Sequence, residues 1–344
     1  MSTGTTHSSD KKVVLCVPRW CGLNDSLVQI WFAHQFATSH GRQLLIDTRI
    51  SGLWDDLDNY LDLQVATKVG QVPITLRVSD SDIHHLNKKR AYPRLFKNRL
   101  DFMHREIFLR ASLEEKRSKL GRSIACVSHS LFDRTPSDFH WGVSRRAHFL
   151  IFLMLSRRRN AANRLSASAN QPVIVHHKSG GGRESLQTLK LFSFAPTLKR
   201  EVGKALNFCG TDFDAIHIRN TDMKTHYVEF LSNSRKRLAG RRVLVCSDDA
   251  EVINAAREQL FESDVFTVTK TEATNGSPLH KLGSDRTPEQ RRLLNFNMLI
   301  DLICLSQGRE LLLARSTNGQ LSGFSALAQS LHGRSDIVQQ LIKE

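Results

Sequence analysis

The stretch "DAIHIRNTD" presents His217, Arg219 and Asp222 within six positions of an apolar run. Side chains of a strand alternate with a period of two, so the pattern predicts that His217 and Arg219 share one face and meet a ligand together at the strand's end. A guanidinium is a rigid fork of donors that matches phosphate oxygens, and a departing diphosphate needs such a cation. The alternative is a surface turn in which Arg219 pairs with Asp222, and this stretch leaves both interpretations open.

Two other loops carry polar groups next to apolar runs. Asp248 and Asp249 follow "VLVCS" and precede a helical pattern, so either carboxylate could face the same ligand. Glu251, however, follows Asp248 at the spacing of a capping box, and capping explains such residues without a ligand. Ser316 and Thr317, in "ARSTNG", could bind an anion at a helix amino end, although both are equally ordinary as helix caps.

Asp301 stands in "NMLIDLICLS", where apolar residues surround it on a predicted helix. Burying a carboxylate without a partner is costly, so something must satisfy it. The adjacent N1 and N2 donors of guanine would bind a carboxylate through two hydrogen bonds. An internal arginine partner, or exposure on the polar face of the helix, explains the residue equally well.

The segments that must position these side chains begin with a βαβ pattern. Residues 12–17 predict a buried strand, 24–39 a helix stopped by Gly41, and 43–48 a returning strand. Such a unit implies a parallel sheet and favours ligand binding at the carboxyl ends of its strands. Farther along, residues 186–207 predict a helix.

The second half of the chain alternates more regularly. Strand patterns at 214–219, 241–247, 264–269 and 310–313 are interleaved with helical patterns at 248–260, 288–308 and 320–333. This alternation predicts an α/β protein with a second doubly wound domain. A chain of 344 residues suits two domains, and we place them at 11–208 and 209–344, after a disordered polar tail at 1–10.

Composition bounds the partners and the compartment. With 49 Lys and Arg against 34 Asp and Glu, the net charge of +15 predicts attraction to phosphates, nucleic acid or anionic lipid. Six cysteines form neither a CxxC pair nor a dense disulfide pattern, which favours a reducing compartment. Without an apolar signal region or a run long enough to span a bilayer, we expect a soluble, cytoplasmic protein.

Three further patterns point to little. The histidine pairs lack metal-binding spacing, so no metal is expected. "SGGGRES" lacks the spacing of a P-loop and is better explained as a flexible turn. The run "RRAHFLIFLMLSRRR" could make peripheral contact with a membrane surface, but a core helix with solvated ends is the favoured interpretation.

Taken in order, these segments resemble the nodulation protein Z type of alpha-1,6-fucosyltransferase and its relatives, the eukaryotic alpha-1,6- and protein O-fucosyltransferases. The resemblance covers most of the chain, with anchors at "RWCGLNDSLVQIWFAHQFATSHGRQLLIDTR", "HIRNTD", "VLVCSDDAEVI", "SPLH" and "LIDLICLSQGRELLLARST". It implies a GT-B-like fold in which two Rossmann-like domains face a cleft. It also implies a GDP-fucose donor, no metal or other cofactor, and inverting transfer to a hydroxyl.

The resemblance also implies roles for matched positions. His217 and Arg219 match an HxR motif that contacts the donor, with Arg219 on the pyrophosphate. Asp301 matches a helix carboxylate that recognises guanine, and the loop at 316–317 matches one that binds phosphate and ribose. Gly22 matches a glycine of the amino-terminal loop that faces the donor.

Some positions depart from the family. Asn24 stands where relatives often have a second loop glycine, Asn220 where the eukaryotic enzymes have an arginine, and Met223 where they have a lysine. These departures put the identity of the sugar in question more than that of the nucleotide. No residue matches the family's catalytic base. The candidates for that role are Asp222, Asp249 and Glu229.

The expected acceptor is an oligosaccharide, free or lipid-linked. Two alternatives stay open. A basic, non-enzymatic protein could bind nucleic acid or another polyanion through "KKRAYPRLFKNR", which explains the net charge but neither Asp301 nor the ordered α/β motifs, so nucleic acid is the disfavoured partner. A member of the fold could also bind GDP without turning over the donor.

Overall fold

The computed structural model describes residues 12–18, 21–49, 51–64, 72–87, 91–92, 172–176, 182–270 and 286–343. Several sequence predictions lie outside these residues. They are the tail at 1–10, the basic segment at 93–122, the apolar run at 149–155, "SPLH" at 277–280 and the glycines of "SGGGRES" at 180–181.

The first part of the chain builds a five-stranded parallel sheet with the order β4-β2-β1-β6-β5. Its strands are β1 (Val13–Cys16), β2 (Gln43–Ile46), β4 (Ile74–Thr75), β5 (Ala91–Tyr92) and β6 (Val173–His176). Helix α1 (Leu23–Ser39) joins β1 to β2 and confirms the predicted βαβ unit. The short elements η1 (Leu57–Asn59) and α3 (Asp80–Asn87) follow β2 and β4 respectively.

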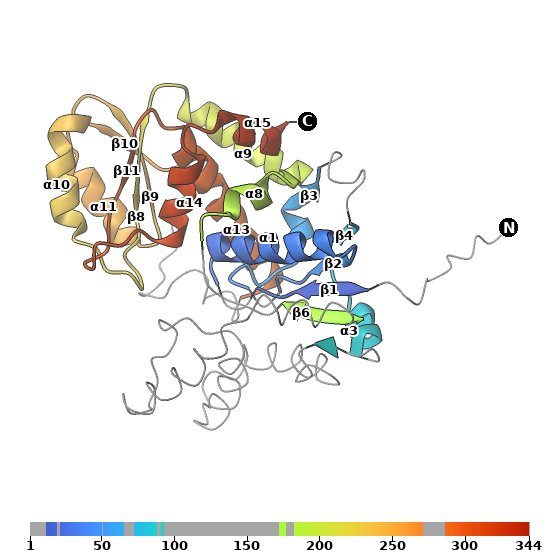
Figure 1. The fold of residues 1–344 in the computed structure, drawn as a ribbon. Helices are drawn as coiled ribbons and strands as arrows, with labels where there is room; N and C mark the ends of the chain where they lie inside the picture. Colours follow the sequence, from blue (N-terminus) through green and yellow to red (C-terminus); the bar gives the residue numbers. More distant parts are fainter. Residues whose placement is uncertain are drawn as a thin grey trace, which may run out of the picture.

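The last part builds a four-stranded parallel sheet with the order β10-β9-β8-β11. Its strands are β8 (Asp214–Ile218), β9 (Arg242–Ser247), β10 (Asp264–Phe266) and β11 (Leu311–Leu313). The helices that the structure describes in this part are α10 (Tyr227–Leu238), α11 (Ala250–Gln259), α13 (Pro288–Gln307), α14 (Gly323–Leu331) and α15 (Ser335–Ile342). Helices α10 and α11 lie on one side of the sheet and α14 on the other (Figure 1).

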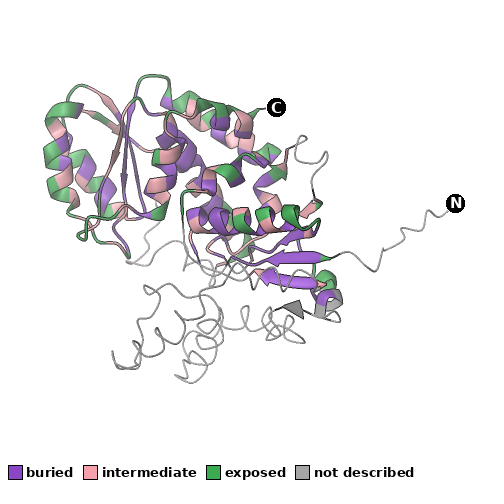
Figure 2. Cartoon of the chain, in the orientation of Figure 1, coloured by how far each residue is buried: buried purple, intermediate pink, exposed green. Residues whose placement is uncertain are grey.

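Apolar residues on both faces explain why helices cover this sheet on two sides. Ile216 and Ile218 of β8 belong to a cluster that includes residues of α10 and α11. Ala215, whose side chain alternates to the opposite face of the strand, belongs to the large cluster that includes residues of α13 and α14. Buried strands between partly exposed helices are visible in Figure 2. Parallel sheets covered on both faces are the expected result of this pattern.

The predicted single helix at 186–207 is wrong. The segment forms α8 (Ser185–Leu189), strand β7 (Phe192–Phe194) and α9 (Pro196–Cys209). Phe192 and Phe194 are both buried at a spacing of two, which suits a strand, and β7 pairs antiparallel with β3 (Leu61–Leu63). Pro196 then opens α9, because proline is well tolerated in the first turn of a helix.

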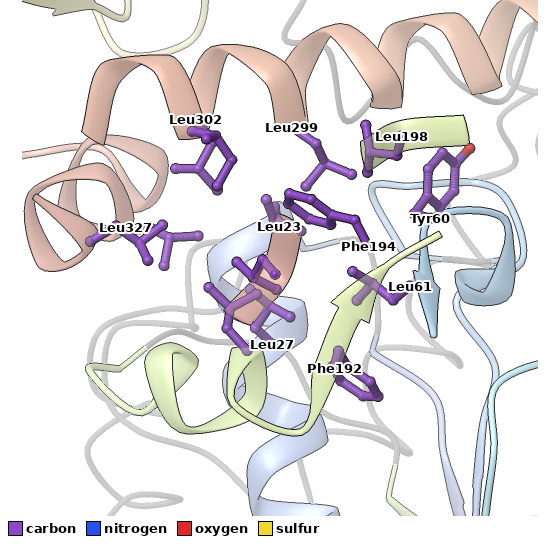
Figure 3. Packing of buried hydrophobic residues seen from close by; sticks show 14 of the residues in the cluster. Leu23, Leu27, Tyr60, Leu61, Phe192, Phe194, Leu198, Leu299, Leu302 and Leu327 are labelled. Carbon is purple, nitrogen blue, oxygen red and sulfur yellow. The ribbon is translucent and has the colours of Figure 1, made fainter. Parts of the chain in front are cut away.

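One hydrophobic cluster runs through both parts of the molecule. Leu27 of α1, Phe194 of β7, Leu299 of α13 and Leu327 of α14 all belong to it, and Figure 3 shows these side chains facing one another. The strands of the first sheet come from residues before 177 and those of the second from residues after 213. The division of the chain at residue 209 stays a prediction.

Candidate functional site

The candidate site lies at the carboxyl edge of the second sheet. Strands β8 and β9 are parallel, with Ile218 opposite Ser247, so the residues that follow each strand leave the sheet side by side. This places Arg219 and Asn220 next to Asp248. In open α/β sheets, ligands bind outside the carboxyl ends of the strands.

His217 is the last residue of β8 that faces α14. It is 5% exposed, its Nδ1 lies 2.8 Å from Ser325 Oγ, and its ring centroid lies 4.9 Å from that of Phe324. Burial, and secondarily the charge of Arg219, lowers the pKa of His217 to about 3. The imidazole is therefore neutral near pH 7 and can offer a hydrogen bond, but no charge, to a donor phosphate.

Arg219 extends past the end of β8 and faces two carboxylates. Its Nε donates to Asp222 Oδ1 at 2.8 Å, and its Nη2 lies 2.7 Å from the same oxygen. Its Nε also lies 3.8 Å from Asp248 Oδ2. The pairing of Arg219 with Asp222, which the sequence left as an alternative, is therefore present, and it occurs at the sheet edge where a ligand site was expected.

The two aspartates after β9 have different roles. Asp248 is buried and accepts the Asn220 amide at 2.9 Å and the Thr221 hydroxyl, so it holds the turn that follows β8. Asp249, not Asp248, caps α11, and its Oδ1 accepts the Glu251 amide at 3.0 Å. The capping spacing counted from Asp248 was therefore off by one residue. A carboxylate that caps a helix is already engaged by its own backbone.

Asn220 organises the loop between β8 and α10. Its Nδ2 donates to Asp249 Oδ2 at 2.9 Å, and its Oδ1 accepts the Thr225 amide at 3.2 Å. Its carbonyl accepts the Lys224 ammonium at 2.8 Å. Asn220, which stands where the resemblance predicts an arginine, is therefore a buried structural bridge, and a larger cation at this position would not fit the same bonds.

Ser316 and Thr317 lie in a loop that is fastened to residues 224–225. The Thr317 amide donates to the Lys224 carbonyl at 2.9 Å, and the Ser316 amide donates to Gln320 at 2.9 Å. The prediction that these residues stand at a helix amino end is wrong, because α14 begins at Gly323, with Ser322 as its cap. Both amides are therefore engaged, and Ser316 Oγ also accepts the Gln320 amide at 3.2 Å, so the two hydroxyls could meet a ligand as hydrogen-bond donors.

Asp301 of α13 is hydrogen-bonded to Thr269, which lies three residues after the end of strand β10. The Thr269 hydroxyl donates to Asp301 Oδ1 at 2.9 Å and to Oδ2 at 3.0 Å, and the Cys246 thiol makes a further hydrogen bond. Burial raises the pKa of Asp301 to about 7, against the effect of these two bonds. Within the described residues, its partners are thus a hydroxyl and a thiol rather than an arginine.

The polar groups follow one another along the sheet edge. His217 of β8 is opposite Cys246 of β9 in the parallel register, and Cys246 contacts Asp301. Adjacent strands are about 4.8 Å apart. Along the edge of the sheet, His217 and Arg219 therefore stand at β8, and Asp301 and Thr269 follow on the side of β9 and β10. Sequence reasoning missed Thr269 and Ser325, although each stands near the end of an element that it had identified.

The amino end of α1 meets the amino end of α14. Gly22 caps α1 through its carbonyl, which accepts the Ser26 amide at 3.0 Å, and a Cβ placed on Gly22 would have no heavy atom within 4 Å. Asn24 is buried, and a Cβ placed on Gly323 would lie 3.5 Å from its Cβ. Asn24 therefore fills the junction of the two helices, while the backbone of Gly22 can be approached closely.

Two other kinds of site are absent from the described residues. Across these residues, there is no group of three or more His, Cys, Asp and Glu side chains that could hold a metal ion. In the described part of the chain, none of the helices combines the length and the apolar character needed to cross a membrane.

The chain shares its fold with solved fucosyltransferases. The structure of NodZ alpha-1,6-fucosyltransferase soaked with GDP-fucose aligns with 93% of this chain and 92% of its own, at a TM-score of 0.54 and 17% identity. The structure of NodZ co-crystallised with GDP aligns over the same shares at a TM-score of 0.54 and 15% identity. The structure of selenomethionine NodZ from Bradyrhizobium aligns with 93% of this chain and 91% of its own, at a TM-score of 0.52 and 16% identity.

These similarities confirm the predicted fold, a GT-B-like α/β architecture with parallel sheets. No protein-family model and no curated protein matches the sequence.

Proposed function

We propose that this protein is a glycosyltransferase that moves fucose, or a related sugar, from a GDP-sugar to an oligosaccharide hydroxyl. The NodZ structures of the same fold are described as soaked with GDP-fucose or co-crystallised with GDP. The observation that carries the proposal is the order of groups along the second sheet. A cation for phosphate stands at β8, and a carboxylate for a base stands beyond β9.

The Asp301 end of the edge suits a guanine base. A carboxylate can accept two parallel N–H donors, one on each oxygen, and guanine supplies such a pair at N1 and N2. Adenine presents an N–H donor beside a ring nitrogen acceptor, which a carboxylate repels. Because the pKa of Asp301 is about 7, we expect guanine binding to strengthen as the pH rises through neutrality.

The Arg219 end suits the diphosphate. In the structure the Asp222 carboxylate pairs with the Arg219 guanidinium, and a bound diphosphate would take the place of that carboxylate. Arg219 would then disperse the charge that develops on the leaving GDP, and the Ser316 and Thr317 hydroxyls would lie on the same side as the Lys224 loop. In this scheme the charge on the leaving group is met without a metal or other cofactor.

The proposed reaction is a single displacement. The acceptor oxygen forms a bond to the anomeric carbon while the bond from that carbon to the β-phosphate oxygen breaks, with inversion. The electron pair leaves with GDP, and the acceptor proton passes to a base. Among the three candidates, Glu229 is exposed in the first turn of α10, and Asp249 is engaged by Glu251 and Asn220. Asp222 would be released when a diphosphate takes Arg219, so Asp222 is the favoured base.

Calorimetric titration with GDP, UDP, ADP and CDP tests the proposal. Selective binding of GDP that Arg219→Ala and Asp301→Ala both weaken is the supporting result. An assay of fucose transfer from GDP-fucose to candidate oligosaccharides, free or lipid-linked, then tests the reaction. Equal binding of the four nucleotides, or none, would remove the donor site from this edge.

A second candidate function is nucleotide binding without transfer, and one observation favours it. Asn220 fixes the loop through Asp249 and Thr225, in place of the arginine that the resemblance expects. Tight, selective GDP binding without donor turnover on any acceptor, and without slow hydrolysis of GDP-fucose, would support that function over catalysis.

A further inference from the structure

The hydroxyl of Thr269 occupies the position in front of the Asp301 carboxylate. Its Oγ1 lies 2.9 Å from one carboxylate oxygen and 3.0 Å from the other. A donor at nearly equal hydrogen-bonding distances from both oxygens lies between them, where the two inward lone pairs converge. One hydroxyl therefore takes the place that a pair of parallel N–H groups would need.

A guanine base would require the same place. Its N1–H and N2–H donors are side by side, and each would bond one oxygen of the carboxylate. Both cannot do so while Thr269 Oγ1 remains between the oxygens. A base with a single donor, such as hypoxanthine with its N1–H, needs only one of the two oxygens and can leave the other to Thr269.

We propose that the Thr269 hydroxyl is an internal placeholder for the two N–H donors of guanine, which displaces it on binding and yields to it again when GDP leaves. Thr269 would thus be a positioning residue that acts through Asp301. The inference rests on the proposed function, because it concerns the base end of the same nucleotide site. Its consequence is weaker retention of GDP, the product of the proposed reaction.

The surroundings of Asp301 explain why a placeholder is useful. Asp301 is partly shielded from water, and a shielded carboxylate without a donor is costly, while the groups that face it are poor donors. From the described elements packed against it these are Cys246 of β9, Cys209 at the end of α9 and Cys304 of its own helix. Burial raises the pKa of Asp301 to about 7, and the Thr269 hydrogen bond is the first of two that lower it. Without that bond the carboxyl would protonate at a higher pH.

These two effects of Thr269 have opposite signs for GDP binding, so pH separates them. We would compare native protein, Thr269→Val and Thr269→Ser by titration with GDP, IDP and ADP at pH 6.5 and pH 9. At pH 9, where Asp301 is ionised in each protein, Thr269→Val should bind GDP roughly 3- to 10-fold more tightly, the range of one net hydrogen bond. IDP should change less. At pH 6.5 the same variant should bind GDP more weakly than native protein.

Thr269→Ser keeps the hydroxyl and should resemble native protein at both pH values. A Thr269→Val variant that binds GDP and IDP more weakly at both pH values would overturn the inference, because the threonine would then only support the fold of the site. Failure of the proposed function is a different result, namely native protein that does not prefer GDP to ADP. Stopped-flow release of GDP adds a rate, which should be slower in Thr269→Val at pH 9.

Discussion

Asp222 and Arg219 form a close ion pair at the end of strand β8, with 2.7 Å between Asp222 Oδ1 and Arg219 Nη2. The pair is partly open to solvent, since the aspartate side chain is 31% exposed and the arginine side chain 18%. A ligand anion can therefore reach the guanidinium only in competition with a carboxylate that belongs to the chain. This competition makes the two residues separable by experiment.

Replacing Asp222 should divide binding from chemistry. Asp222→Asn removes the competing charge, so GDP should bind more tightly, by roughly 2- to 5-fold as for a partly exposed ion pair. Turnover should fall by about 10²-fold or more if Asp222 accepts the acceptor's proton. Calorimetry gives the first quantity and a donor-consumption assay the second. Asp336→Asn, which breaks the exposed pair with Arg334, is the matched control and should change neither.

Arg219→Ala should abolish transfer while leaving the protein folded. Loss of one charged hydrogen-bond donor to a leaving group costs about 10²-fold or more in rate. Although the Arg219 side chain is only 18% exposed, Asp248 keeps its hydrogen bonds to Asn220 and Thr221 in the variant, so the thermal unfolding midpoint should stay close to that of native protein. Arg334→Ala removes an equally charged residue from the distant α15 region and should retain activity. Near-normal turnover by Arg219→Ala would remove the central role of this arginine.

Gly22→Ala tests whether a donor approaches the start of α1. Because the added Cβ meets no protein atom within 4 Å, the variant should lose less than about 1 kcal/mol of folding free energy. A ligand that approaches the glycine backbone would meet the methyl group, and GDP affinity should fall. Gly203→Ala in α9 also meets no atom within 4 Å and serves as the control, with unchanged GDP affinity. Equal affinity in both variants would place the donor away from Gly22.

Asp301→Asn should change how stability depends on pH. The ordinary pKa of an aspartate is 3.8, and in the folded protein that of Asp301 is about 7, so between these values the native state binds more protons than the unfolded state. The free energy of unfolding therefore falls as the pH rises through this window, by a total on the order of 4 kcal/mol. The asparagine variant lacks this loss and should be the more stable protein at pH 8.

Denaturant unfolding of both proteins from pH 4 to pH 8, without nucleotide, measures this difference. His217 acts in the opposite direction, because its pKa is lowered to about 3 and the unfolded state binds more protons below 6.5. Since His217 is present in both proteins, its contribution cancels in the comparison. A difference that does not vary with pH would mean that Asp301 titrates near its ordinary value.

The sequence patterns identified the elements that carry the site, because their apolar periods are strong. Strands β8 and β9 and helices α1 and α13 lie where the alternation and the caps predicted them. Helices α10 and α15 were not identified, and the segment at 186–207 was predicted as one helix, whereas it forms two helices and a strand between them. Phe192 and Phe194 form a strand there because they pair with β3, which lies far away in the sequence.

The contacts of the site were predictable only in part. The pairing of Arg219 with Asp222 is local, three residues apart, and was foreseen as an alternative. Thr269 meets Asp301 across 32 residues, because β10 joins the edge of the sheet and α13 packs over it. Such a contact depends on strand order and helix packing, which no local period encodes. The roles of His217, Asp301 and Gly22 toward a donor stay predictions.

The hydrophobic cluster that joins α1, β7, α13 and α14 has a consequence for how the chain can be divided and moved. Leu299 and Leu327 are each buried within it, together with Leu27 and Phe194 from the other part of the chain. A fragment that starts at residue 209 would expose such side chains to water and should aggregate rather than fold. The two sheets should instead unfold in one cooperative transition, and any opening between them must be small enough to leave this shared interior dry.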